Sequence, residues 1–116
     1  MSTGQLNEAV LVEIARQQRR VQRRPRPEPW RRWDVARDQD DRTFGPLYSP
    51  RWFGPAAATE AGRVRHLRAV YALAGCGLVH LVKSEGGRLE RVRLTPAGRT
   101  AVAALAAAGR AGPMSD

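Results

Sequence analysis

The chain has few of the residues on which most chemical functions depend. Its single cysteine, Cys76, excludes an intramolecular disulfide and a cysteine-rich metal site, and fits a reducing compartment. The two histidines have no carboxylates placed near them in a metal-binding pattern. GxSxG, a phosphate-gripping glycine loop and a paired histidine–carboxylate motif are all missing. We therefore expect no enzyme activity, no bound metal and no cofactor.

Long apolar runs are missing too. No stretch of the sequence approaches the roughly 20 residues that a membrane-spanning helix needs. The first residues have no apolar core of the kind found in signal peptides. We therefore expect a cytoplasmic protein that has no membrane partner.

Lysine is nearly absent, whereas arginine is abundant. Among 116 residues, 20 are basic and 11 acidic, which gives a net charge of +9, and Lys83 is the one lysine. A compact cation attracts polyanions, of which nucleic acid is the usual one, although ribosomal or generic polyanion binding remains open. Much of the 42% hydrophobic content is alanine, which predicts a thin core. Further burial in a homodimer would compensate for it.

The charges form blocks along the chain. Arginines dominate residues 16–32 and again residues 63–99. Residues 33–42 between them carry most of the acidic side chains of the first half, namely Asp34, Asp38, Asp40 and Asp41. We expect this acidic patch to pair with one basic block and to leave the other free.

We predict a single domain over residues 1–116, with residues 1–6 frayed. A first helix over 7–24, capped by Asn7, ends before Pro25 because proline disfavours helical geometry in the residue before it. A connecting segment, 25–54, follows, in which residues 33–42 form a short helix. It holds six of the seven aromatic residues, and we expect them to pack onto the helices: Trp30, Trp33, Phe44, Tyr48, Trp52 and Phe53.

Residues 55–108 alternate between helix and strand signals. A short helix over 55–61 and a turn at Gly62 lead to a helix over 63–75 that ends at the glycines around Cys76. Strands over 78–83 and 88–94 flank a glycine tip, and Thr95 caps a helix that reaches about residue 108. The apolar stripe of the 63–75 helix is Val64, Leu67, Val70, Tyr71 and Ala74. The fold class is mainly α with a small β-hairpin wing, a winged helix-turn-helix.

The stretch LRAVYALAGCGLVHLV…GGRLERVRLTPAGR resembles the recognition helix, wing and following helix of bacterial MarR/PadR-like winged-helix transcriptional regulators. The resemblance implies three helices, a wing of two or three strands, a homodimer and binding to palindromic double-stranded DNA. Residues 25–54 have no counterpart that can be aligned. No small-molecule effector is indicated by the sequence.

The resemblance assigns DNA contacts to three groups of residues. N-terminal residues of a recognition helix enter the major groove, and a basic wing lies along phosphates or in the minor groove. Arg65, Arg68 and Ala72 lie near one face, which we favour as the base-reading one. The predicted contacts are Arg63, Arg65, His66 and Arg68 on the helix, Lys83, Arg88, Arg91 and Arg93 on the wing, and Arg19, Arg20 and Arg23 on the first helix.

Less specific interpretations of the same residues remain open. The helix arginines also fit a solvated stripe, and charged wing residues also protect an edge strand from aggregation. The arginines of the first helix suit a membrane surface or the nearby aspartates equally well. The WRRW motif at 30–33 fits stacking on single-stranded bases, although anchoring in a core or interface is favoured. For the whole protein, the alternatives are a protein-interaction module and an RNA or single-strand binder. For Cys76, a buried structural thiol is favoured over a redox switch.

Overall fold

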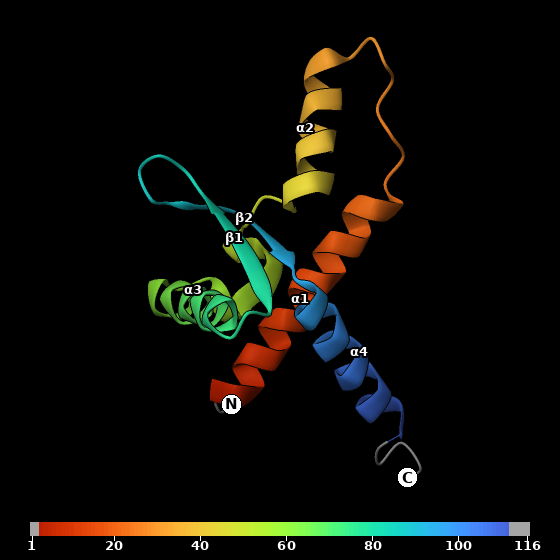
Figure 1. The fold of residues 1–116 in the computed structure, drawn as a ribbon. Helices are drawn as coiled ribbons and strands as arrows, with labels where there is room; N and C mark the ends of the chain where they lie inside the picture. Colours follow the sequence, from red (N-terminus) through yellow and green to blue (C-terminus); the bar gives the residue numbers. More distant parts are fainter. Residues whose placement is uncertain (1–2, 112–116) are drawn as a thin grey trace.

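A computed structural model describes residues 3–111 of the chain (Figure 1). Helices dominate, and one antiparallel hairpin lies between the third and fourth α-helices. This layout is consistent with a winged helix and confirms the predicted fold class. In chain order the elements are α1 (Thr3–Arg23), α2 (Arg32–Phe44), the 3-10 helix η1 (Pro50–Ala57), α3 (Glu60–Gly75), β1 (Val79–Lys83), β2 (Leu89–Leu94) and α4 (Pro96–Ala111).

Helix α1 is the spine of the fold and packs against α2, α3, β2 and α4. It begins at Thr3, so the predicted fraying of residues 3–6 and the cap at Asn7 were wrong. The helix ends at Arg23, as the proline at position 25 predicts. Its apolar face is buried as the periodicity indicated, through Val10, Leu11, Ile14, Ala15 and Val21.

The core lies between α1, α3 and the hairpin. On α3 the buried face is Gly62, His66, Ala69, Val70 and Leu73. The predicted stripe was therefore wrong at two positions, because Val64 and Tyr71 are exposed. The buried face of α3 is set by its small residues, Gly62 and Ala69, which the predicted stripe left out. A Cβ atom on Gly62 would lie 2.2 Å from the carbonyl oxygen of Ala56, so this glycine lets η1 press against α3 and is not a turn residue.

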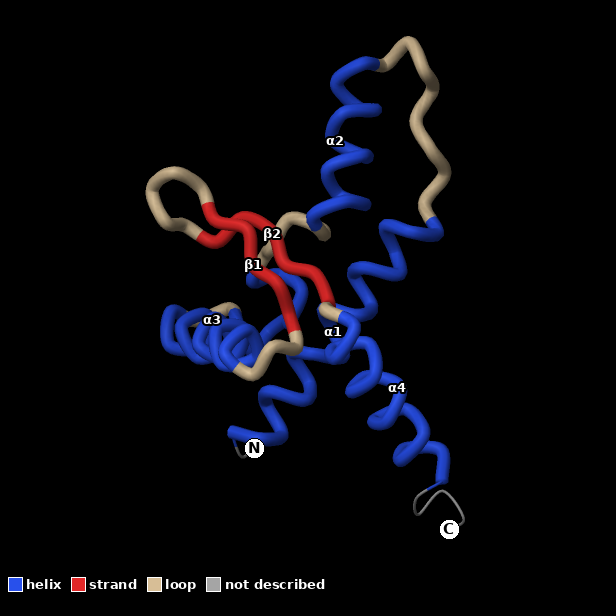
Figure 2. The backbone as a smooth tube through the Cα atoms, in the orientation of Figure 1, coloured by secondary structure: helices blue, strands red, loops and turns tan. Residues whose placement is uncertain are grey.

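The hairpin contains a bulge that settles the orientation of its return strand. Val82 pairs with Arg91 and Lys83 pairs with Leu89, which leaves Glu90 as the extra residue on β2. Leu89 thereby reaches the same core as Val92 and Leu94. An isolated antiparallel bridge joins Leu47 to Arg91 on β2, beside the two strands drawn in red in Figure 2.

The segment that was expected to be mostly irregular contains α2 and the start of η1. The predicted helix over 33–42 is confirmed and extends to Phe44. Tyr48, Trp52 and Phe53 pack onto the core and against one another, with ring centroids 5.4 to 6.4 Å apart. Burial also raises the pKa of Tyr48 to about 12.

The remaining three aromatic residues of that segment do not pack as predicted. Trp30 is 74% exposed, Trp33 is 89% exposed and Phe44 is 44% exposed. All three lie in or beside α2, which projects from the body of the molecule (Figure 1). Their exposure is the largest departure of the structure from the sequence expectations.

The hairpin leads into α4 through the predicted cap. The Thr95 hydroxyl accepts a hydrogen bond from the amide of Gly98 at 3.0 Å, and Pro96 occupies the first helical position. The helix continues to Ala111, past the expected end near residue 108. Over residues 3–111, no helix combines the length and the apolar character that a bilayer crossing requires.

Candidate nucleic-acid interface

The solvent-facing side of α3 carries free arginines. Thr59 caps the helix by accepting a hydrogen bond from the Gly62 amide at 3.0 Å. Beyond this cap, Arg65, Arg68 and Ala72 are all exposed, which is the face favoured from the sequence. Within residues 3–111, neither arginine side chain has a hydrogen bond or ion pair. Two guanidinium groups are thus presented to solvent on one face, with a small residue beside them.

Arg63 is exposed but is not free. Its guanidinium donates a hydrogen bond to the carbonyl oxygen of Ala58 at 3.0 Å and so folds back along the chain that precedes α3. This contact is solvent-exposed and therefore contributes little to stability. Arg63 lies two residues before Arg65 and therefore on a different side of α3 from Arg65 and Arg68.

His66 is buried, and its predicted contact with a base or phosphate does not fit the structure. The side chain is 5% exposed, and its ring stacks on Phe53 with centroids 4.6 Å apart. Its Nδ1 lies 2.7 Å from the carbonyl oxygen of Gly62, which can only accept, so Nδ1 carries the proton. The close approach of η1 at Gly62 turns this position inward, which the sequence periodicity did not show.

The hairpin carries three exposed basic side chains, Lys83, Arg88 and Arg93, of which Lys83 contacts α3. Lys83 lies over the ring of Tyr71, 4.9 Å from its centroid, so the end of β1 is tied to α3 by a cation–π contact. Arg88 and Arg93 are exposed and make no side-chain hydrogen bond or ion pair within the part of the chain described. The tip is ordered by Ser84, whose amide donates to the Arg88 carbonyl oxygen at 2.8 Å.

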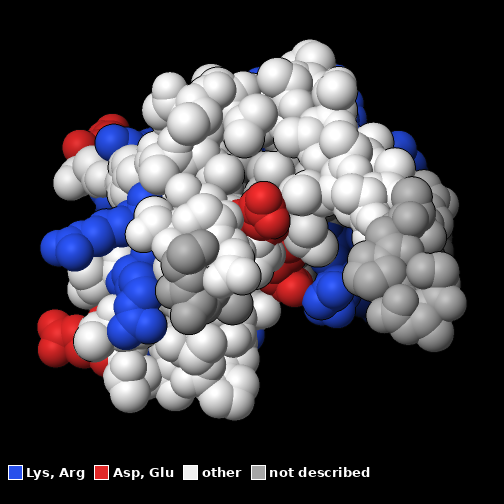
Figure 3. All heavy atoms as spheres, turned by 90° about the horizontal axis from the view of Figure 1, so that it is seen from below, with Lys and Arg blue, Asp and Glu red and all other residues white. Residues whose placement is uncertain are grey.

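Helix α3 and the hairpin tip lie on the same side of the molecule (Figure 1). Figure 3 shows basic side chains gathered along that side, with a few acidic ones beside them. An exposed helix flanked by a basic hairpin matches the width of a nucleic-acid groove and its adjoining backbone. This surface is the strongest candidate site of the chain.

Arg91 does not belong to this surface, contrary to the prediction for the wing. Its guanidinium donates to a carboxylate oxygen of Asp41 and, at 2.9 Å, to the carbonyl oxygen of Gly45. The side chain is only 12% exposed. Arg91 and Arg93 lie two residues apart on β2, but α2 covers the first and leaves the second exposed.

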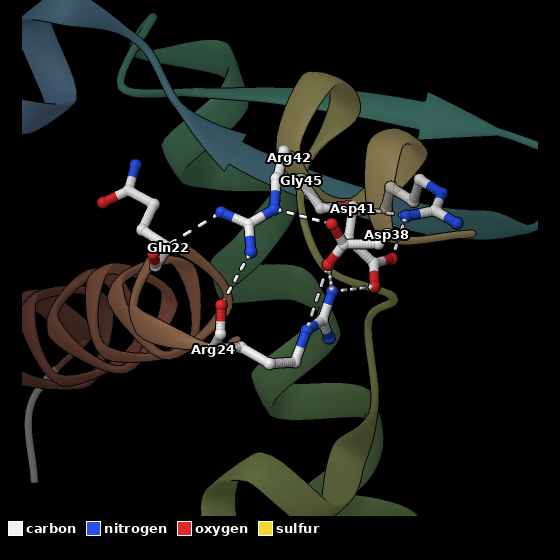
Figure 4. A network of polar contacts seen from close by, with 7 residues as sticks. Gln22, Arg24, Asp38, Asp41, Arg42 and Gly45 are labelled. Carbon is white, nitrogen blue, oxygen red and sulfur yellow. Dashed lines mark hydrogen bonds and ion pairs between the residues drawn. The ribbon is translucent and has the colours of Figure 1, made fainter. Parts of the chain in front are cut away.

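Asp41 is one member of a buried polar network that fixes α2 (Figure 4). Arg24 donates to Asp38 and, at 3.1 Å, to Asp41. Arg42 donates to Asp38 at 2.8 Å and to the carbonyl oxygen of Arg24 at 2.8 Å. The acidic patch therefore pairs with cations from both basic blocks, whereas we predicted pairing with one.

The contacts of this network shift the pKa values of two of its members, Asp38 and Arg24. The guanidinium groups of Arg42 and Arg24 hold the pKa of the Asp38 carboxyl below its ordinary value. The same contacts raise the pKa of Arg24, first through its hydrogen bond to Asp38. Both aspartates are nearly buried, at 5% and 8% exposed, and the surrounding guanidinium groups offset the cost of burying their carboxylates.

The first-helix arginines form a second basic surface. Arg19, Arg20 and Arg23 are exposed, and their side chains make no hydrogen bond or ion pair among the described residues. They line an open groove of about 800 Å³ whose other wall includes Pro46 and Trp52. In Figure 1 the end of α1 lies across the molecule from α3, so the structure does not bring these arginines together with the α3 and hairpin residues.

Cys76 follows the end of α3 and is exposed, so the expectation of a buried thiol was wrong. Gly75, Cys76 and Gly77 end the helix as predicted, with Gly77 at a φ of 76°. In residues 3–111, no group of three or more histidine, cysteine or acidic side chains is placed to hold a metal ion.

Comparison of the chain with family models, with curated proteins and with solved structures yields no match. Its function is therefore inferred from its own residues and their arrangement.

Proposed function

We propose that the chain is a sequence-specific double-stranded DNA-binding protein and a transcriptional regulator. The exposed, unpaired Arg65 and Arg68 on α3 carry this proposal. In winged helices of the MarR/PadR kind, which the sequence resembles, this helix enters the major groove. Arginine there donates two hydrogen bonds to the O6 and N7 atoms of guanine.

The hairpin would supply affinity more than sequence discrimination. Lys83, Arg88 and Arg93 are exposed, and their side chains would meet phosphates beside the groove that α3 would enter. Arg93 or Arg88 also suits a narrow minor groove, where the negative potential is strongest. The net charge of +9 and the separate α1 surface add long-range attraction.

The test begins with selection of bound duplexes from a random pool. A palindromic consensus would support both base reading and binding by two copies, whereas no enrichment would contradict the proposal. Arg65→Ala and Arg68→Ala are then compared on the selected duplex. Each should lose roughly 1–3 kcal/mol of specific binding and much less on unrelated DNA.

Arg99→Ala is the matched control. Arg99 is exposed, but it lies on α4, away from α3 and the hairpin tip (Figure 1). Its loss should lower specific and nonspecific binding by the same small factor, because only net charge changes. Equal losses of specific and nonspecific binding in the α3 variants would overturn the base-reading role.

A further inference from the structure

One face of α2 is exposed along its whole length and has no partner within the described chain. Trp33, Arg37, Asp40 and Phe44 are spaced by four, three and four residues, which places them on a single helical face. Trp33 is 89% exposed and Phe44 is 44% exposed, while Arg37 and Asp40 are also exposed. We call these four residues the outer face of α2.

The opposite side of α2 prevents this face from turning inward. Asp38, Asp41 and Arg42 point the other way and join the buried network with Arg24 and Arg91 (Figure 4). Rotating α2 to bury its tryptophan would withdraw those charged groups from their partners and leave nearly buried carboxylates unpaired. The outer face is therefore held toward solvent.

The chemistry of the outer face is self-complementary. An aromatic ring stands at each end, and one cation and one anion stand between them. Neither Arg37 nor Asp40 has an ion-pair partner in residues 3–111. If a second α2 packs antiparallel, Trp33 meets Phe44 of the second copy while Arg37 meets Asp40, and each pair occurs twice. Both pairs are centred on the same point of the helix, as a two-fold axis requires.

We propose that the outer face of α2 is the interface between two copies of this chain. Trp30, which is 74% exposed just before α2, extends the apolar end of that face. Covering the exposed parts of the six aromatic rings in two copies would bury about 800 Å². With the intervening charged and small residues, the contact reaches the roughly 1,000 Å² of a specific interface.

A second copy fits this face better than a nucleic acid does. Stacking platforms for single strands pair aromatic rings with a positively charged groove. Here Arg37 and Asp40 cancel, and the Asp40 carboxylate would repel a phosphate backbone. The proposed interface also leaves α3 and the hairpin tip uncovered. It does not depend on the proposed DNA binding, although it would supply the two copies that a palindromic site requires.

Charge reversal provides the test, with mass in solution as the readout and no DNA present. Wild-type protein should sediment at twice the chain mass of 12.8 kDa and dissociate on dilution. Arg37→Asp and Asp40→Arg should each be monomeric, because like charges then face each other. An equal mixture of the two variants should recover the dimer, since every pair becomes opposite in sign. Arg32→Asp, the same change elsewhere on α2, should remain dimeric.

Trp33→Ala tests the apolar end of the face. The variant should raise the dissociation constant of the dimer by about 30-fold, as expected for loss of a large aromatic contact. Its circular dichroism spectrum should be unchanged. The proposal is overturned if wild-type protein is monomeric, or if it is dimeric and Arg37→Asp, Asp40→Arg and Trp33→Ala leave its dissociation constant unchanged. Quenching of a monomer's tryptophan fluorescence by single-stranded oligonucleotides would instead assign the face to stacked bases.

Discussion

Helices α2 and α3 use arginine in opposite ways. On α3, Arg65 and Arg68 stand free in solvent, whereas at the base of α2 the guanidinium groups of Arg24, Arg42 and Arg91 are committed to two aspartates. The difference lies in the carboxylates, which occur at Asp38 and Asp41 but not on the exposed face of α3. An arginine-rich sequence therefore divides into structural cations and cations available for a ligand.

Among the predicted effects, the loss of stability on removing the Asp41 carboxylate should be the largest. Asp41→Ala leaves the nearly buried Arg91 without a carboxylate and deprives Arg24 of one, which should cost roughly 3–5 kcal/mol of unfolding free energy. Urea unfolding measures the loss. Asp34→Ala, whose pair with Arg31 is exposed and 3.8 Å long, should change stability by less than about 1 kcal/mol. Similar losses in both variants would remove the distinction between the two kinds of ion pair.

His66 sharpens the comparison within α3 itself. His66→Ala removes the stack on Phe53 and leaves a cavity beside Gly62, so the protein should lose about 2 kcal/mol of stability. Arg65→Ala, one residue earlier, should leave the thermal midpoint nearly unchanged. Differential scanning calorimetry separates the two. A His66→Ala variant as stable as wild type would show that the side chain is not part of the core.

Acid should weaken α2 before it affects the α3 surface. Because the folded-state pKa of Asp38 lies below its unfolded value of 3.8, its contribution is present above that pH. It is lost as the pH falls through 3.8 toward the folded pKa. The stability gap between wild type and Asp38→Asn should therefore narrow below about pH 4, as urea midpoints across the pH range would show. A gap that stays constant down to pH 2 would contradict the assigned direction.

The smallest expected effect is on the salt dependence of DNA binding, and it should distinguish Arg93 from Arg91 on β2. Arg93→Ala should lower the dependence of DNA affinity on salt by about one unit of slope, as loss of one phosphate contact does. Arg91→Ala should leave that slope unchanged and lower stability instead, because its guanidinium already bonds Asp41 and Gly45. Binding titrations at several salt concentrations distinguish the two residues, and equal slopes would remove the distinction.

Local signals in the sequence predicted most of the fold. Proline at 25, the glycines around Cys76 and the Thr95 cap each act within a few residues, and all three element ends were located correctly to within a residue or two. The favoured face of Arg65, Arg68 and Ala72 also proved to be exposed, because helical spacing alone decides which residues share a face.

Long-range contacts were the part that the sequence could not supply. His66 turns inward because Gly62 admits η1 against α3, and Arg91 is covered because Asp41 approaches from another element. The exposure of Trp30 and Trp33 reversed an expectation based on ring size alone. For His66 and Arg91, the deciding partner lies outside the periodic window from which the prediction was made.

The carboxylate of Asp41 also constrains the order of folding. Its partners are 17 and 50 residues away along the chain, on the end of α1 and on β2. Contacts of such separation form late, because chain closure costs entropy before any bond is made. During synthesis, the contact between Asp41 and Arg91 can form only after residue 91 has left the ribosome. Until then, α2 can dock only against the end of α1, through Arg24.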